Sequence, residues 1–416
     1  MALKRELGLL STTLYGIGII LGAGIYALIG VGAGIAGNML WLAFIISSII
    51  AIFTGLSYAE LSSMFPRAAA EYRYTKMAFN RELFSFVIGW VLVAGTIIAA
   101  STVALGFAGY FASLFGGEIP VIAVSLIAVM SILNYIGIEA SARFNNFAAV
   151  LEAGGLLIVV AVWLVFPPEL PADLLEIPSG GIASIITAVG IIFFAYIGFE
   201  NIANLAEEVK DSRKNIPRAL ILSLIISTIL YVLVSIAAVE EVGAVALSQS
   251  DAPLTTVVSR GLGEYSGILS YIALFATGNT VLIFLIAASR ILYGMSESGS
   301  IAKFFSVTDL HGTPKYAILF AGIISSAIAL SGDIKIVAQL TDLGVFIAYV
   351  AVNASLIALV NSKFKRKFTS PRIAKIPILA WLGLLTSLFM LLSFEPQLWL
   401  LEAVVVMTGL ILYELR

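Results

Sequence analysis

Long runs of apolar residues alternate with short polar segments along the whole chain. Twelve runs are long enough to cross a bilayer as helices, each of which needs about 20 mostly apolar residues. The predicted spans are 9–36, 39–64, 84–113, 120–137, 146–166, 182–206, 218–239, 265–294, 316–331, 336–360, 374–393 and 397–413. The pattern therefore predicts an all-α integral membrane protein that forms a single membrane domain over 1–416.

Two of these spans carry residues that weaken a helix at its middle. The first has Gly18, Gly22 and Gly24, and the sixth places Gly198 and Glu200 inside an apolar stretch. Glycine lets the backbone leave helical geometry, and unwound backbone at membrane depth persists only where protein or water satisfies its polar groups. Glycines at this spacing also serve close helix packing, which is the alternative interpretation.

The positions of the two interruptions favour a repeat. Spans one and six are five apart, so the second enters the membrane from the opposite side. This arrangement predicts an inverted repeat of 9–166 and 182–360, followed by two additional helices over 374–413. Interruptions at equivalent places in two inverted halves indicate a binding site near the bilayer midplane.

Composition and charge agree with this picture. Of the 416 residues, 60% are hydrophobic and 12% are charged, and cysteine is absent. No polar tract remains for a soluble or nucleic-acid-binding domain. With the N-terminus inside, every Lys and Arg except Arg260 and Lys335 falls on the inner side, and Arg290 is assigned to an inner loop. This bias predicts cytoplasmic N- and C-termini in a cell (plasma) membrane.

Broken helices offer backbone groups that suit an amino acid. Free N–H groups at Gly22, Ala23 and Gly24 would hold a carboxylate. Free carbonyls at Ile20 and between Phe194 and Ile197 would accept hydrogen bonds from an ammonium group. Neither interaction requires a charged side chain.

Three acids lie within predicted spans, where an ionisable group indicates function by default. Glu200 either caps free N–H groups or exchanges a proton, and the sequence does not decide between these roles. Glu152 is either a tolerated neutral acid or a proton carrier. Asp342 lies near the outer end of its span, where contact with water is the simpler interpretation. The polar run that contains Asn279 either lines a cavity or bonds neighbouring helices.

The chain resembles the amino acid–polyamine–organocation (APC) superfamily of transporters, closest to its prokaryotic amino acid permeases and the cationic amino acid transporter branch. The stretches that carry this resemblance are Gly18 to Tyr26, Phe193 to Glu200 with Glu207 to Arg218, and Ser289 to Met295. The resemblance implies a LeuT-type fold with five plus five inverted spans and two further helices.

The same resemblance implies the site residues. Gly22, Ala23 and Gly24 would present N–H groups to the substrate carboxylate, and the carbonyls of Ile20 and Ile197 beside Gly198 would receive the amino group. Phe194 would be the occluding aromatic, and Glu200 matches an acid linked to proton-sensitive gating. Some relatives carry a lysine in span five where this chain has Glu152. An acid cannot replace that cation, so Glu152 would cycle a proton beside Gly18 and Asn279 or attract a cation.

The expected function is secondary active transport of amino acids by alternating access, as proton-coupled symport of small or neutral amino acids. Two alternatives remain open: an antiporter for amino acids or polyamines without proton coupling, and a transporter-derived sensor. An enzyme is not expected, because the usual metal and Cys/His constellations are missing. We expect no metal and no cofactor. The expected partners are an amino acid, protons and the lipid bilayer.

Overall fold

The computed structural model of the protein describes residues 4–168, 172–250, 252–309, 312–330, 334–392 and 394–414. Helices dominate these residues, and strand-like pairing within them is limited to isolated bridges. The α-helices are α1 (Leu9–Leu21), α2 (Ala23–Ala36), α3 (Leu40–Met64), α4 (Ala70–Phe79), α5 (Glu82–Phe115), α6 (Ile119–Ile136), α7 (Ile138–Val165), α8 (Gly181–Ile192), α9 (Asn201–Asn204), α10 (Ser212–Val242), α11 (Ala244–Gln249), α12 (Pro253–Leu262), α13 (Ile268–Glu297), α14 (Lys315–Ala329), α15 (Ile334–Leu359), α16 (Ile378–Leu391) and α17 (Pro396–Glu414). Short 3-10 turns are η1 (Gly37–Met39), η2 (Phe193–Tyr196), η3 (Gly263–Gly267) and η4 (Lys303–Ser306).

The predicted all-helical membrane class is confirmed. Ten stretches of the described chain are long and apolar enough to cross a membrane, and they correspond to ten of the twelve predicted spans. The ninth and eleventh predicted spans correspond to α14 and α16, which are apolar but have only 15 and 14 residues. Helices of that length fall short of the roughly 20 residues that an upright crossing needs.

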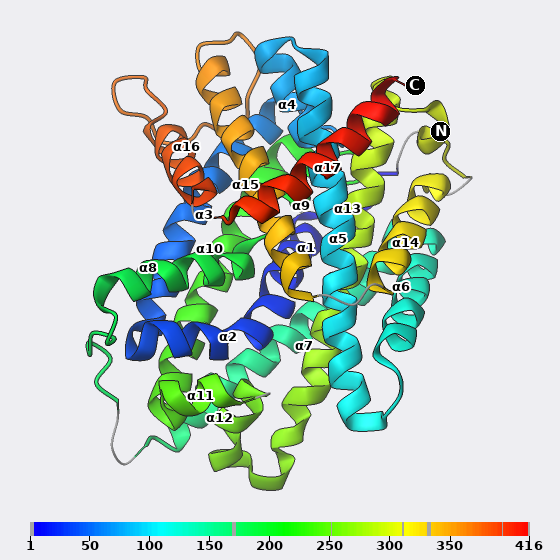
Figure 1. Ribbon diagram of the computed structural model, residues 1–416. Coiled ribbons are helices and arrows are strands. Elements are labelled where there is room, and N and C mark those ends of the chain that lie inside the picture. The colour runs from blue at the N-terminus through cyan, green and yellow to red at the C-terminus, as the bar shows by residue number, and fades with distance from the viewer. Residues whose placement is uncertain are drawn as a thin grey trace.

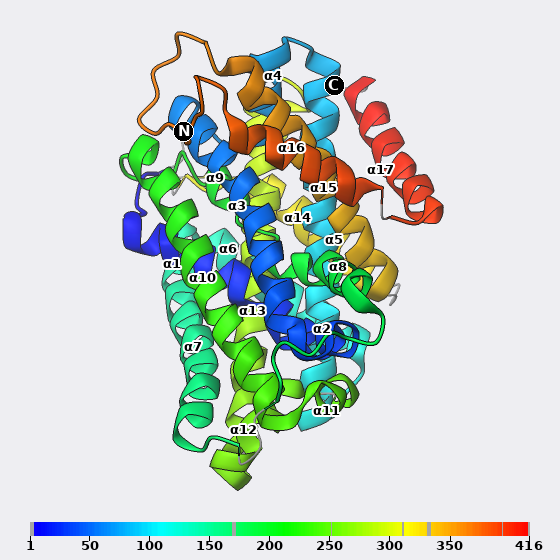
Figure 2. The ribbon, with the colours of Figure 1, turned by 90° about the vertical axis from the view of Figure 1, so that its left-hand side faces the viewer.

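The helices form an elongated bundle (Figure 1). The first and last described residues lie toward the same end, together with α4, while α11 and α12 lie at the opposite end (Figures 1 and 2). Helices α4, α11 and α12 were not among the predicted spans, because each has ten residues or fewer. They connect the long helices at the two ends of the bundle.

The surface of the bundle is apolar and its interior holds charges. Large hydrophobic side chains are exposed on the outer helices, as at Val121, Leu164 and Leu400. Glu60, Glu152 and other acids are fully buried. A water-soluble protein shows the reverse distribution, because exposed contiguous apolar surface and buried charge are both costly in water.

Arg290 differs from its predicted place. It lies inside α13, fully buried, and its guanidinium donates to both oxygens of Glu208 at 3.1 and 3.0 Å. Asn134 Oδ1 and the Ser289 hydroxyl accept further bonds from the same guanidinium, at 2.8 and 2.9 Å. Arg290 is therefore an internal ionic link between segments distant in sequence, and its assignment to an inner loop was wrong.

The segment before α1 is paired with the segment after α9. The backbone N–H groups of Glu6 and Leu7 donate to the Glu208 carbonyl at 2.9 and 3.0 Å, and Lys210 N–H donates to the Leu7 carbonyl at 2.8 Å. This short parallel bridge between Leu7 and Val209 joins the beginning of the first broken helix to the end of the second.

Candidate functional site

The first span is interrupted at Gly22. Helix α1 ends at Leu21, α2 begins at Ala23, and Gly22 between them has φ −49° and ψ −129°, outside helical geometry. No described side chain caps the beginning of α2. The first N–H groups of a helix have no partner within it, so the beginning of α2 presents donors and a positive dipole end.

The sixth span is interrupted over a longer segment. Helix α8 ends at Ile192, the turn η2 follows, and the backbone is extended at Ile197 before it turns at Gly198. Gly198 has φ +114°, a conformation that residues with a side chain rarely adopt. A Cβ at this position would also lie 2.6 Å from Ile19 Cγ1 of α1. Both the turn and the close approach of α1 therefore require glycine.

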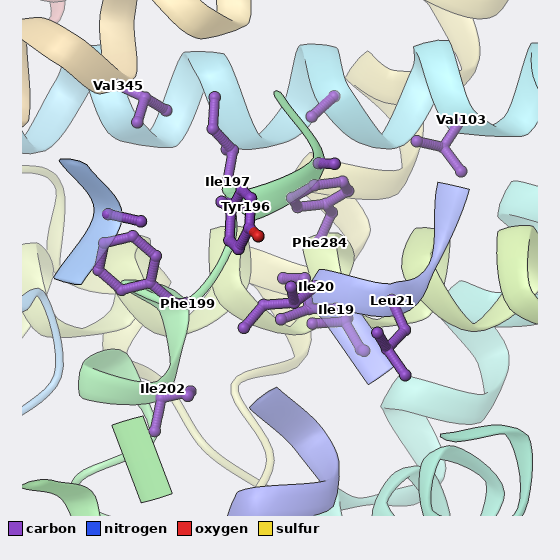
Figure 3. Close-up of a cluster of buried hydrophobic side chains, with 14 of the residues drawn as sticks. Ile19, Ile20, Leu21, Val103, Tyr196, Ile197, Phe199, Ile202, Phe284 and Val345 are labelled. Carbon is purple, nitrogen blue, oxygen red and sulfur yellow. The ribbon is translucent and has the colours of Figure 1, made fainter. Parts of the chain in front are cut away.

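The two interruptions lie against each other. A Cβ at Gly24 would lie 2.5 Å from the Cα of Ala195, so the beginning of α2 touches the backbone of η2. Helix α2 packs against α8, and α1 packs against α9. Figure 3 shows Ile20 from α1 beside Tyr196 and Ile197 from the second break, with Phe284 of α13 next to them. The four half-helix ends thus meet inside the bundle, surrounded by apolar side chains.

The carbonyl groups of the two breaks differ in their bonding. The Phe194 carbonyl accepts a hydrogen bond from Ile197 N–H at 3.1 Å, and the Phe194 side chain is only partly buried. The Ile20 carbonyl accepts from the hydroxyl of Tyr231, a residue of α10. The same hydroxyl lies 3.0 Å from the carbonyl oxygen of Ala195. Tyr231 therefore connects the two breaks, and the sequence prediction did not include it.

A second group of predicted residues gathers where α1, α7 and α13 meet. Asn279 Nδ2 donates to Glu152 Oε1 at 3.1 Å. A Cβ at Gly18 would lie 2.7 Å from Asn279 Nδ2 and 2.8 Å from Asn145 Oδ1. Gly18, Glu152 and Asn279 are thus brought together, as the resemblance implied, with Asn145 as an unpredicted fourth member.

Several polar atoms of this group have no hydrogen-bond partner among the described residues. They are Glu152 Oε2, Asn279 Oδ1 and both side-chain polar atoms of Asn145. All three side chains are buried, and no described cation forms an ion pair with Glu152. Leaving a buried polar group without a partner costs about 1–3 kcal/mol. The cluster is chemically suited to hold a proton, a water molecule or a small cation.

Glu200 closes the turn of the second break. Its Oε2 accepts from the Gly198 N–H at 2.9 Å and from the Tyr349 hydroxyl at 2.8 Å, while Asn201 Nδ2 lies 3.4 Å from Oε1. The carboxylate thus satisfies backbone at the break itself and contacts α15 through Tyr349. Asp342 on α15 is also buried, and its Oδ1 has no described partner, in contrast to the predicted contact with water.

The residues that sequence reasoning missed are single polar groups on otherwise regular helices: Tyr231, Asn145 and Thr280. Thr280 lies against the first break, because a Cβ at Gly22 would be 1.8 Å from its hydroxyl oxygen. Thr280 belongs to the polar run around Asn279, so the sequence did indicate that this part of the helix contacts a cavity or neighbouring helices. For Tyr231 no local pattern exists, since one tyrosine in an apolar helix is equally typical of lipid contact.

Comparison of the sequence with known proteins identifies the family of this chain. The sequence profile described as "Amino acid permease" matches residues 7–405. The chain is 30% identical to a branched-chain amino acid permease of Bacillus subtilis (strain 168), over 100% of this chain and 93% of that relative. A methylthioribose transporter of the same organism is 28% identical, over 100% of this chain and 94% of its own length.

More distant similarity extends to plants. The mitochondrial cationic amino acid transporter 3 of Arabidopsis thaliana is 29% identical over 82% of this chain and 60% of its own length. The profile covers nearly the whole chain, both breaks included, and the relatives are named as a permease and as transporters. The protein is therefore a member of the amino acid permease family of the APC superfamily.

Proposed function

We propose that this permease is a secondary active transporter of amino acids that works by alternating access. The observation that carries the proposal is the meeting of two broken helices at Gly22 and Gly198, inside the bundle. The N–H groups of Gly22, Ala23 and Gly24 would bind the substrate carboxylate. The carbonyls of Ile20 and Ile197 would bind its ammonium group, with Phe194 covering the substrate.

The proposed substrates are small or neutral amino acids. Apolar side chains surround the breaks, among them Ile19, Leu21 and Phe284 (Figure 3). Such walls suit an aliphatic side chain, because a charged one would lose its hydration without compensation. The name of the branched-chain relative agrees with this class, whereas that of the plant relative favours cationic amino acids. A direct comparison of the two classes therefore belongs in the test.

Proton coupling is the second part of the proposal. Burying a charged carboxylate without a neighbouring cation is costly. The fully buried Glu152 side chain would therefore hold a proton and be neutral, and it would become charged when that proton is transferred. Loss of that proton would change the bonding to Asn279 and, through the contact at Gly18, the position of α1. Glu200 is the second candidate proton site, because it bonds the backbone of the other break. An exchanger without proton coupling and a sensor are the alternatives.

We further propose that 9–166 and 182–360 are the inverted halves and that 374–413 is peripheral to the site. The pairing of α2 with α8 and of α1 with α9 supports this division, because each half contributes one broken helix. The charge bias supports a plasma-membrane protein whose two termini face the cytoplasm.

The experiment is uptake into proteoliposomes that contain the purified protein. Branched-chain, small neutral and cationic amino acids are supplied, together with methylthioribose, with and without an imposed pH gradient. We expect accumulation of neutral amino acids, faster when the outside is acidic. Exchange that is indifferent to the gradient would favour the antiporter, and ligand-induced thermal stabilisation without any flux would favour the sensor. Absence of binding and flux for every amino acid would refute the proposed function.

A further inference from the structure

Tyr231 is the one described residue whose side chain bonds the backbone of both broken helices. It lies in the middle of α10 and is fully buried. Its ring is held between Phe44 of α3 and Tyr196 of η2, each with a centroid separation of 5.2 Å. The hydroxyl is thereby fixed at the junction of the two breaks.

The hydroxyl has one hydrogen and faces two carbonyl oxygens. It donates to the Ile20 carbonyl and lies 3.0 Å from the Ala195 carbonyl, so one of the two acceptors is incompletely satisfied. Ile20 precedes the last residue of α1, where carbonyl groups have no partner within the helix. In a buried site both carbonyls require a donor from elsewhere.

An ammonium group would meet the same requirement better. It carries three hydrogens, so it donates to both carbonyls at once, and its charge strengthens each bond. The tyrosine hydroxyl and a substrate ammonium group would therefore compete for the same acceptors. With Tyr231 in this position the two breaks touch each other, because a Cβ at Gly24 would lie 2.5 Å from the Cα of Ala195.

We infer that the Tyr231 hydroxyl substitutes for the substrate ammonium group in the empty transporter, and so lets the empty protein close and change the side to which it opens. This inference rests on the proposed function, because it requires a substrate amine at Ile20. A transporter without this substitute would carry substrate in both directions, but its return without substrate would be slow. Tyr231 would then set the balance between net transport and exchange.

Tyr231→Phe is the test, since it removes the hydroxyl and keeps the ring. Net uptake into empty proteoliposomes is compared with exchange in vesicles preloaded with the same amino acid. We expect net uptake to fall at least about tenfold, while exchange changes little. A tenfold change in rate corresponds to a free-energy difference of ~1.4 kcal/mol. Substrate affinity, measured by thermal shift, should rise because the internal competitor is gone.

The matched control is Tyr15→Phe. Tyr15 is also buried and its hydroxyl donates to one backbone carbonyl, that of Ile283, at 3.3 Å. Its loss should leave the ratio of net uptake to exchange unchanged. An unchanged ratio in Tyr231→Phe, or an equal loss of both activities, would overturn the inference.

Two further results separate the possible failures. If Tyr231→Phe yields no folded protein, Tyr231→His replaces it: the shorter imidazole does not bring its N–H to the position of the hydroxyl, so the same selective loss of net uptake is expected, and a wild-type ratio of net uptake to exchange in Tyr231→His would contradict the inference. If the wild-type protein neither binds nor exchanges any amino acid, the proposed function fails. If the wild type exchanges amino acids but Tyr231→Phe keeps the wild-type ratio, the role of Tyr231 alone is refuted.

Discussion

Glu71 lies on α4, outside the ten candidate membrane spans, yet its side chain is fully buried. One oxygen accepts from Asn204 Nδ2 at 3.3 Å, and the other has no partner among the described residues. Burial raises the pKa of the Glu71 carboxyl from 4.5 to about 7, and the charge of Glu200 acts in the same direction. The nearby Tyr58 hydroxyl, the Asn204 amide and the residue's own backbone oppose part of this effect.

The sign of the consequence follows from linkage. Because the folded protein binds this proton more tightly than the unfolded chain, stability is fully present below the unfolded pKa of 4.5 and falls as pH rises through about 7. The difference between 4.5 and about 7 corresponds to a loss of about 3 kcal/mol at alkaline pH. Glu71→Gln has the same shape and never ionises, so we expect it to avoid this loss.

Thermal unfolding of the detergent-purified protein, followed by tryptophan fluorescence over a range of pH, measures the effect. The variant should match the wild type at acidic pH and unfold at a higher temperature at about pH 8, where Glu71 is ionised. The control is Glu139→Gln, because the Glu139 side chain is 66% exposed and pairs with Arg143 in the same helix. Parallel pH profiles for wild type and Glu71→Gln, or a variant less stable at alkaline pH, would refute the reasoning.

Three other predictions concern the site and the ionic link. Gly24→Val should abolish the substrate-induced rise in melting temperature while the protein still reaches the membrane, because its side chain would collide with the Ala195 backbone; normal affinity would count against the carboxylate site. Glu152→Gln should remove the pH dependence of initial uptake rates, and an unchanged profile would exclude this acid as the proton carrier. Glu208→Gln should destabilise the protein by about 3–5 kcal/mol in unfolding experiments, since Arg290 is left buried and unpaired. Addition of Arg290→Met should recover part of that loss; additive losses would argue against the electrostatic explanation.

The parts of the fold that the sequence predicted are those with a local cause. Apolar runs determine where the long helices lie, and the glycines at 22 and 198 permit the two breaks. The choice between helix packing and a break at Gly22 needed the structure, since both use the same residue type. In the structure Gly22 serves both, because it leaves helical geometry and also lies against Thr280.

The parts that sequence reasoning missed depend on contacts between distant segments. The charge bias assigns Arg290 to an inner loop, whereas its bidentate bond to Glu208 explains why it lies buried in α13. Tyr231 is separated from Ile20 by 211 positions, so no window of sequence relates the two. Asn145 likewise acquires its meaning from the approach of Gly18 on α1.

The bridge between Leu7 and Val209 has a mechanical consequence for any opening movement. It fastens the beginning of α1 to the segment that follows α9, so these two parts of the broken helices are expected to move as one unit. The Glu208 side chain attaches that unit to α13 through its ion pair with Arg290. Movement of α1 and α9 together would displace carbonyl groups of both breaks at the same time, and it would require loss of the Glu208–Arg290 pair as well as of the bond from Tyr15 to the Ile283 carbonyl.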